Sequence, residues 1–152
     1  MLTIATFNLC NLDAAASRER VARLGAIIAN DLGAPDIVAL QEVVAISRSV
    51  DGPVPAEAAY QALIAAIGGA GGPDYDFREI PPRAQHDGGM AGANIRVGLL
   101  FNPARVGFPD RGQAGPEDRV GILFSEGRPG LTLNPGRIDP KNPAFTGDER
   151  CH

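Results

Sequence analysis

Two short apolar runs, separated by one amphipathic segment, constrain the fold of this chain more than any other feature. Leu2 to Asn8 predicts a central strand, because its apolar side chains alternate onto both faces. Ile37 to Gln41 is an uninterrupted apolar run of strand length. Between them, Ser17 can cap a helix that Gly33 and Pro35 stop. The apolar residues of this helix fall on one stripe: Val21, Leu24, Ile28 and Leu32. This β-α-β start predicts an α/β fold.

The pattern weakens along the rest of the chain. A second helix is expected to begin near Pro55, and a short strand is expected from Tyr75 to Ile80. The clearest later strand is Ile95 to Phe101, whereas Val120 to Phe124 and Leu131 to Leu133 are weaker predictions among Gly and Pro. The remaining residues have almost no periodicity. We therefore expect them to belong to a longer chain whose next strand has been cut away.

Composition narrows the class of protein. The 152 residues are enough for one domain, and 44% hydrophobic with 21% charged residues is ordinary for a soluble one. A net charge of -4 provides no basic field for nucleic acid. No apolar run approaches the ~20 residues that span a bilayer, so we expect no membrane partner. Two sparse cysteines predict free thiols. Because no charged n-region followed by an apolar stretch precedes the first strand, we expect a cytoplasmic protein, or a secreted one if a signal peptide has been removed.

Two polar residues follow the first two predicted strands. Asn8 follows the strand that ends at Phe7, and Glu42 follows the strand that ends at Gln41. If these strands are neighbours, an amide oxygen and a carboxylate lie close together at the carboxyl edge of the sheet. Such oxygen ligands suit a hard cation such as Mg²⁺. The alternative is that Asn8 begins a turn through its side chain and Glu42 is a solvated residue.

Four segments, in order, resemble the endonuclease/exonuclease/phosphatase family, which includes DNase I-like nucleases. Residues 6–12 (TFNLCNL) and 35–43 (PDIVALQEV) resemble its first two motifs, and the second is the more specific. Residues 87–89 (DGG) with 94–103 (NIRVGLLFNP) are similar to a loop and strand of bacterial members. Residues 134–140 (NPGRIDP) are similar to the segment that precedes the strand leading to the catalytic histidine.

The resemblance implies a fold and a chemistry. The fold is a DNase I-like two-sheet α/β sandwich, of which residues 1–152 form the N-terminal half of one domain. The implied enzyme is a hydrolase of phosphodiester or phosphomonoester bonds that uses Mg²⁺ (or Mn²⁺) held by Asn8 and Glu42. Cys10 stands where the family often has an acid, and a thiol is a poor Mg²⁺ ligand. Neither His86 nor His152 matches the catalytic histidine, so the catalytic residues are unknown and this chain alone is expected to be inactive.

Three further residues are candidates for binding phosphate. Asn94 and Arg96 share one face of their strand, and Arg137 is a second arginine whose planar fork suits phosphate. For each arginine, a surface charge or a structural ion pair is an equal alternative. The implied partner is a phosphate-ester substrate, with nucleic acid among the candidates and no obligate protein partner.

Two other functions compete with hydrolysis. One is a non-catalytic interaction protein that keeps the fold, with Cys10 marking a decayed metal site. The other is a nucleotide-binding α/β domain, which ranks last because the first strand is not followed by a Gly-x-Gly-x-x-Gly segment. Half of a two-sheet domain should also expose an apolar face, so we expect the isolated chain to be poorly soluble or oligomeric.

Overall fold

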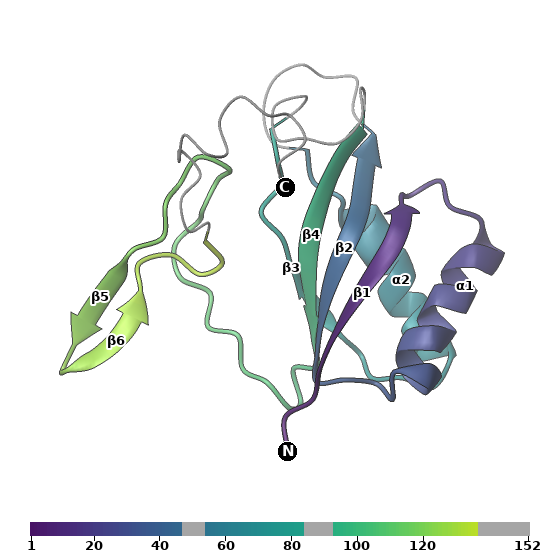
Figure 1. Cartoon of the computed structure of the whole chain (residues 1–152), viewed down its shortest axis with the longest axis horizontal. Coiled ribbons are helices and arrows are strands. Elements are labelled where there is room, and N and C mark those ends of the chain that lie inside the picture. The colour runs from purple at the N-terminus through teal and green to yellow at the C-terminus, as the bar shows by residue number, and fades with distance from the viewer. Residues whose placement is uncertain (47–53, 84–92, 137–152) are drawn as a thin grey trace.

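A four-stranded mixed sheet is the centre of the structure, a computed structural model that describes residues 1–46, 54–83 and 93–136. Its strands lie in the order β1-β2-β4-β3 (Figure 1). β1 and β2 are parallel, whereas β4 runs antiparallel to both β2 and β3. The strands are β1 (Ile4–Leu12), β2 (Ile37–Ile46), β3 (Asp76–Arg78) and β4 (Ala93–Phe101). The chain is therefore a mixed α/β protein, as its β-α-β start predicts.

Two helices pack together on one side of this sheet. α1 (Arg18–Ala26) begins where the Ser17 side chain accepts the Arg20 N–H, and it continues as the π-helix η1 (Ile27–Asp31). α2 (Glu57–Gly69) lies beside α1. The two helices approach closely at Gly25, where a Cβ would lie 2.6 Å from the Ala66 carbonyl carbon.

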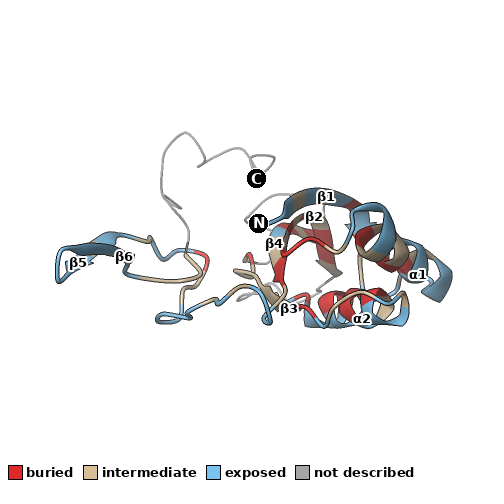
Figure 2. Ribbon diagram, turned by 90° about the horizontal axis from the view of Figure 1, so that it is seen from below, coloured by how far each residue is buried: buried red, intermediate tan, exposed pale blue. Residues whose placement is uncertain are grey.

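The hydrophobic core lies between the sheet and these helices. Figure 2 shows the buried residues gathered there. Fully buried residues from both layers meet in one cluster that includes Leu9, Val38, Leu40, Leu63, Ile67 and Leu100. The opposite face of the sheet is exposed in the described part of the chain, since Ile4 is 66% and Val97 63% accessible. Alternation along the strands thus separates a buried face from an open one.

Several expectations about the strands and the first helix need correction. β1 is an edge strand of the described sheet and not a central one, because only β2 pairs with it, and its even-numbered residues from Ile4 to Cys10 are exposed. β2 does not end at Gln41 but continues to Ile46, because it pairs with the whole length of β4. The first helix changes to π geometry at Ile27 and does not stay α-helical to Leu32.

The segment after β4 folds against the sheet and then leaves it as a hairpin. Arg78 of β3 forms an ion pair with Asp110, in which Nη2 lies 2.6 Å from Oδ2. Its guanidinium lies over the rings of Phe101 and Phe108. Beyond this contact, β5 (Ile122–Ser125) and β6 (Arg128–Leu131) form a separate two-stranded sheet that projects away from the helices (Figures 1 and 2). The first strand of this hairpin overlaps the expected Val120 to Phe124, whereas the expected Leu131 to Leu133 shares only Leu131 with β6. Among the described residues, no helix is long and apolar enough to cross a membrane.

Candidate functional site

The structure brings Asn8 and Glu42 together. In the parallel ladder between β1 and β2, Asn8 is the partner of Gln41, and the Asn8 side-chain Nδ2 donates to Glu42 Oε1 at 2.9 Å. Asn8 is exposed and Glu42 is half-buried, so the pair is open to solvent on the uncovered side of the sheet. The expectation that two neighbouring strands place Asn8 beside Glu42 is confirmed, but the amide group presents its nitrogen to the carboxylate and not the expected oxygen, which accepts the Cys10 N–H.

Both strands lose their regular register at this pair. Between β2 and β4, the pairs Leu40–Gly98 and Val43–Arg96 enclose one extra residue of β2, which is a β-bulge. Simple alternation from the buried Leu40 would point the side chain of Glu42 toward the helices. Instead, Glu42 adopts φ 57°, and its carboxylate reaches Asn8 on the open side. The bulge therefore directs this carboxylate out of the core.

Asn8 and Glu42 lie inside their strands and not after them, which corrects the expectation that they follow the last strand residue. β1 continues to Leu12 because its register with β2 resumes at the pair Leu12–Val43, beyond the irregular stretch. Sequence pattern places a strand end where alternation stops, and a bulge stops the alternation without ending the pairing.

A strained turn follows Asn8. Asn8 Oδ1 accepts the Cys10 backbone N–H at 2.8 Å, which is the side-chain turn given above as the alternative to a metal role. Cys10 and Asn11 have φ values of 53° and 60°, a left-handed conformation that non-glycine residues rarely adopt. Both features coexist at Asn8, since its oxygen forms the turn while its nitrogen contacts Glu42.

Strained backbone is unusual in ordinary sheets and is concentrated at functional sites. Three of the five non-glycine residues with positive φ in the described chain are Cys10, Asn11 and Glu42, and all three surround this one contact. The sequence gives only a weak signal of this strain, because none of these three positions is occupied by glycine, the residue that usually adopts positive φ.

Neutral polar side chains extend the site along the same face. Gln41 Nε2 donates to Thr6 Oγ1 at 2.6 Å, which links β2 to β1 beside the Asn8–Glu42 pair. The same nitrogen also donates to the Ala39 carbonyl of its own strand at 3.2 Å. Cys10 is an exposed free thiol. Sequence reasoning did not single out Gln41 or Thr6, although both lie inside the first two motifs.

The donor set fits a weak, strongly hydrated Mg²⁺ site. Mg²⁺ takes one or two carboxylates and keeps several waters, and Glu42 supplies one carboxylate beside the amide of Asn8. An amide oxygen has two lone pairs, so Asn8 Oδ1 can accept from Cys10 and still face a cation. Within residues 1–46, 54–83 and 93–136, no three His, Cys, Asp or Glu side chains gather into a fuller metal site.

The arginine and asparagine expected to meet phosphate are built into the interior instead. Arg96 Nη1 forms an ion pair with Glu79 Oε2 at 3.1 Å, and the two side chains are only 3% and 7% exposed. Arg96 also donates to the carbonyls of Val54 and Asn94. Asn94 is buried, and its Nδ2 donates to the Ala45 carbonyl at 3.3 Å. For Arg96, the structure therefore supports the alternative of a structural ion pair over phosphate binding. Arg137 lies outside the described residues.

Several other predicted residues also fall outside the described part of the chain. These are His86, His152, Cys151 and the loop at 87–89. Their expected roles stay as stated from the sequence.

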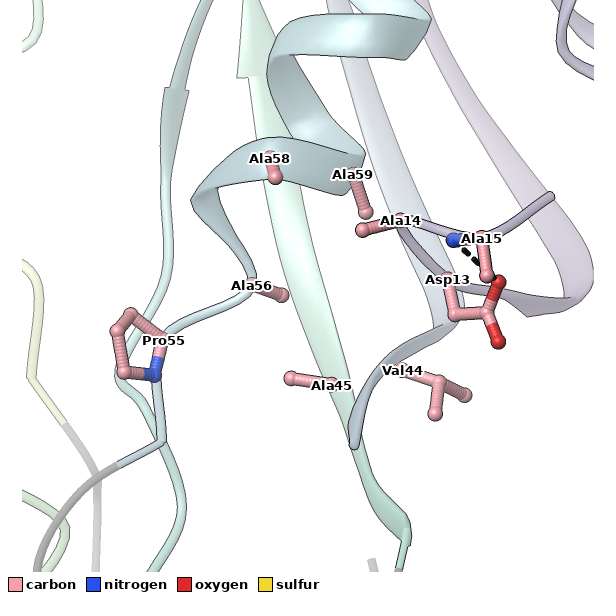
Figure 3. Close-up of a pocket in the computed structure, with 9 residues that line it drawn as sticks. All are labelled: Asp13, Ala14, Ala15, Val44, Ala45, Pro55, Ala56, Ala58 and Ala59. Carbon is pink, nitrogen blue, oxygen red and sulfur yellow. Dashed lines mark hydrogen bonds between the residues drawn. The ribbon is translucent and has the colours of Figure 1, made fainter. Parts of the chain in front are cut away.

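A small cavity lies near the site on the helix side of the sheet. It has a volume of about 230 Å³. Figure 3 shows that it is bounded by the segment after β1, the end of β2 and the start of α2, mostly through alanine side chains. Asp13 is its only charged lining residue among those described, and Asp13 Oδ1 accepts the Ala15 N–H at 3.0 Å. Neither Asn8 nor Glu42 lines it, so the cavity and the polar pair are separate features.

Comparisons with known proteins do not add to this evidence. No family model matches the chain, and no curated protein or solved structure matches it either.

Proposed function

We propose that this chain carries part of the metal site of a Mg²⁺-dependent (or Mn²⁺-dependent) phosphoesterase with a DNase I-like fold. The observation that carries the proposal is the contact between Asn8 and Glu42 across two parallel strands at a point where both strands leave regular register. The four ordered sequence motifs support the same family, and the first two of them contain Asn8 and Glu42. The reaction would be hydrolysis of a phosphodiester or phosphomonoester bond.

The residues of this chain would hold the cation and fix its position. Glu42 would supply the negative charge, and Asn8 Oδ1, which also accepts the Cys10 N–H, would supply a neutral oxygen without a second charge that repels the carboxylate. When bound, the cation would polarise a phosphoryl oxygen or stabilise a leaving group. The bulge at Glu42 and the turn after Asn8 keep the two side chains on the open face, where a substrate has access.

Mn²⁺ binding to the purified chain tests the proposal, measured by the loss of the free-ion signal in electron paramagnetic resonance. Glu42→Gln should weaken Mn²⁺ binding at least about tenfold, because even the loss of a residue that only supports a metal ligand costs 10–100-fold. The matched control is Glu126→Gln, which removes the same charge from the exposed turn between β5 and β6. Equal Kd values for wild type, Glu42→Gln and Glu126→Gln would refute a metal site at Glu42.

Hydrolysis provides a second test. Any metal-dependent cleavage of a chromogenic phosphodiester, by this chain or by a longer one that contains it, should be lost in Glu42→Gln and retained in Glu126→Gln. Cleavage that survives Glu42→Gln unchanged would place the catalytic metal elsewhere.

An interaction protein without catalysis is the second candidate, and exposed apolar side chains favour it. Ile122 and Phe124 of the hairpin are 71% and 74% exposed, and Ile4 and Val97 are exposed on the open face of the sheet. Large exposed apolar patches mark association surfaces or aggregation. Absence of Mn²⁺ binding together with concentration-dependent association in analytical ultracentrifugation would favour this candidate over the phosphoesterase.

A further inference from the structure

One arginine of α1 holds the strained turn that follows Asn8. Arg20 Nη2 donates to the Leu9 carbonyl at 2.8 Å and to the Cys10 carbonyl, and Nη1 lies 3.5 Å from the Asn11 carbonyl. One guanidinium thus contacts three consecutive carbonyls at the end of β1.

These carbonyls belong to the strained backbone segment at residues 9–11. Each residue in the left-handed conformation costs roughly 1–2 kcal/mol, and Cys10 and Asn11 both adopt it. The Asn8 side chain holds the turn from one side through the Cys10 N–H, and Arg20 holds it from the other through the carbonyls. A turn that relaxed would release Asn8 Oδ1 and change its position relative to Glu42.

The placement of Arg20 in its helix is not explained by helix stability. Ser17 caps α1 by accepting the Arg20 N–H at 3.2 Å, so Arg20 lies in the first turn. A cation in the first turn is opposed by the helix dipole, which favours anions there by about 0.3–1 kcal/mol. The carbonyls of β1 supply the compensating partial charges.

We propose that Arg20 is a positioning residue for the Asn8–Glu42 pair, an inference that rests on the proposed metal site. It binds neither the cation nor the substrate. It keeps the turn at residues 9–11 in the conformation that presents the amide of Asn8 beside Glu42.

Electrostatics and positioning predict opposite effects of removing Arg20. Loss of a nearby positive charge, by itself, would strengthen the binding of a cation. Loss of a positioning contact would weaken it, as the removal of groups that orient metal ligands does, by about 10–100-fold. The sign of the change in Mn²⁺ affinity therefore decides between them.

The experiment compares three variants of the whole chain by Mn²⁺ binding. Arg20→Gln is expected to raise the Kd about tenfold, and Arg20→Lys is expected to recover part of the loss because an ammonium can still donate to one or two of the carbonyls. Arg23→Gln is the control, since it removes one positive charge from the exposed side of the same helix. Thermal unfolding of each variant shows whether it is folded at the assay temperature. Wild-type or tighter binding by folded Arg20→Gln would overturn the inference.

A second measurement separates this inference from the proposed function. If wild type binds no Mn²⁺, or Glu42→Gln binds it as wild type does, the proposed metal site fails independently of Arg20. Amide hydrogen exchange at Cys10 then decides whether Arg20 positions the turn, because Arg20→Gln should accelerate exchange there and Arg23→Gln should not. Unchanged exchange at Cys10 in Arg20→Gln would show that Arg20 does not hold the turn.

Discussion

The buried ion pair between Arg96 and Glu79 yields the sharpest stability prediction. Substitution of Arg96 by Met keeps most of the side-chain volume but leaves the Glu79 carboxylate, 7% exposed, without its cation. Breaking a buried ion pair from one side costs about 3–5 kcal/mol. Domains are stable by only about 5–15 kcal/mol, so the loss is a large part of the total. For a chain of this size it corresponds to a fall in Tm of roughly 6–20 °C.

The effect should extend beyond the pair, because Glu79 and Arg96 connect three segments. Glu79 Oε1 accepts the Ala56 N–H at 2.9 Å next to the start of α2, while Arg96 donates to the Val54 carbonyl before that helix and to Asn94 on β4. The chain contains no tryptophan, so urea unfolding is best followed by far-ultraviolet circular dichroism.

A double variant distinguishes a buried charge from lost packing. In the Arg96→Met background, Glu79→Leu should recover a large part of the lost free energy, because no unpaired carboxylate then remains in the interior. A loss below about 1 kcal/mol in Arg96→Met is the value expected of an exposed ion pair and would refute the reasoning. Inorganic phosphate tests the other role predicted for Arg96, since a phosphate ligand would stabilise wild type and not Arg96→Met.

Three further predictions follow from single contacts. Gly98→Ala should destabilise the fold by about 1–3 kcal/mol in urea unfolding, because its Cβ would lie 2.1 Å from the Tyr60 hydroxyl and 2.7 Å from its ring; a neutral effect would contradict this close packing. Tyr60→Phe should leave stability unchanged or raise it, since the buried Tyr60 hydroxyl has no hydrogen-bond partner among the described residues, and a clear loss would reveal one. The hydrogen bond from Arg105 lowers the pKa of Asp36 from 3.8 to about 2, so the stability that Asp36 contributes is complete above about pH 4 and lost as pH falls toward 2. The stability difference between wild type and Asp36→Asn should therefore shrink over that range in acid titrations, and a constant difference would be inconsistent with it.

The periodicity of apolar residues predicted a helix or strand well where one face of that element is buried. The stripe formed by Val21 in α1 and Ile28 in η1, and the run that becomes β2, follow directly from the repeat of apolar residues. It failed where pairing overrode alternation. The register shift at Glu42 depends on β4, which is more than fifty residues away in sequence, and alternation along β2 alone cannot show it.

The same distinction applies to the edge position of β1. An apolar strand has the same composition whether it is covered on one face or on two, so the alternation of Leu2 to Asn8 indicated that both faces can be buried but not what covers them. In the described chain, the helices cover the face of Phe7 and Leu9, and Ile4 on the other face is exposed. The same holds for the charge of Arg96, because its buried partner Glu79 lies on a different segment and the sequence around Arg96 does not reveal the pairing.

By itself, the sequence determined the helix and strand types and the order of the first elements, and it suggested Asn8 and Glu42 as a pair, because each of these inferences depends on nearby residues or on a local motif. Tertiary structure decided the rest. It placed the two side chains 2.9 Å apart, directed Glu42 out of the core through a bulge, and brought Arg20 to the turn after Asn8. These features depend on contacts between segments distant in the chain, and such contacts form only when register, packing and backbone strain are satisfied together.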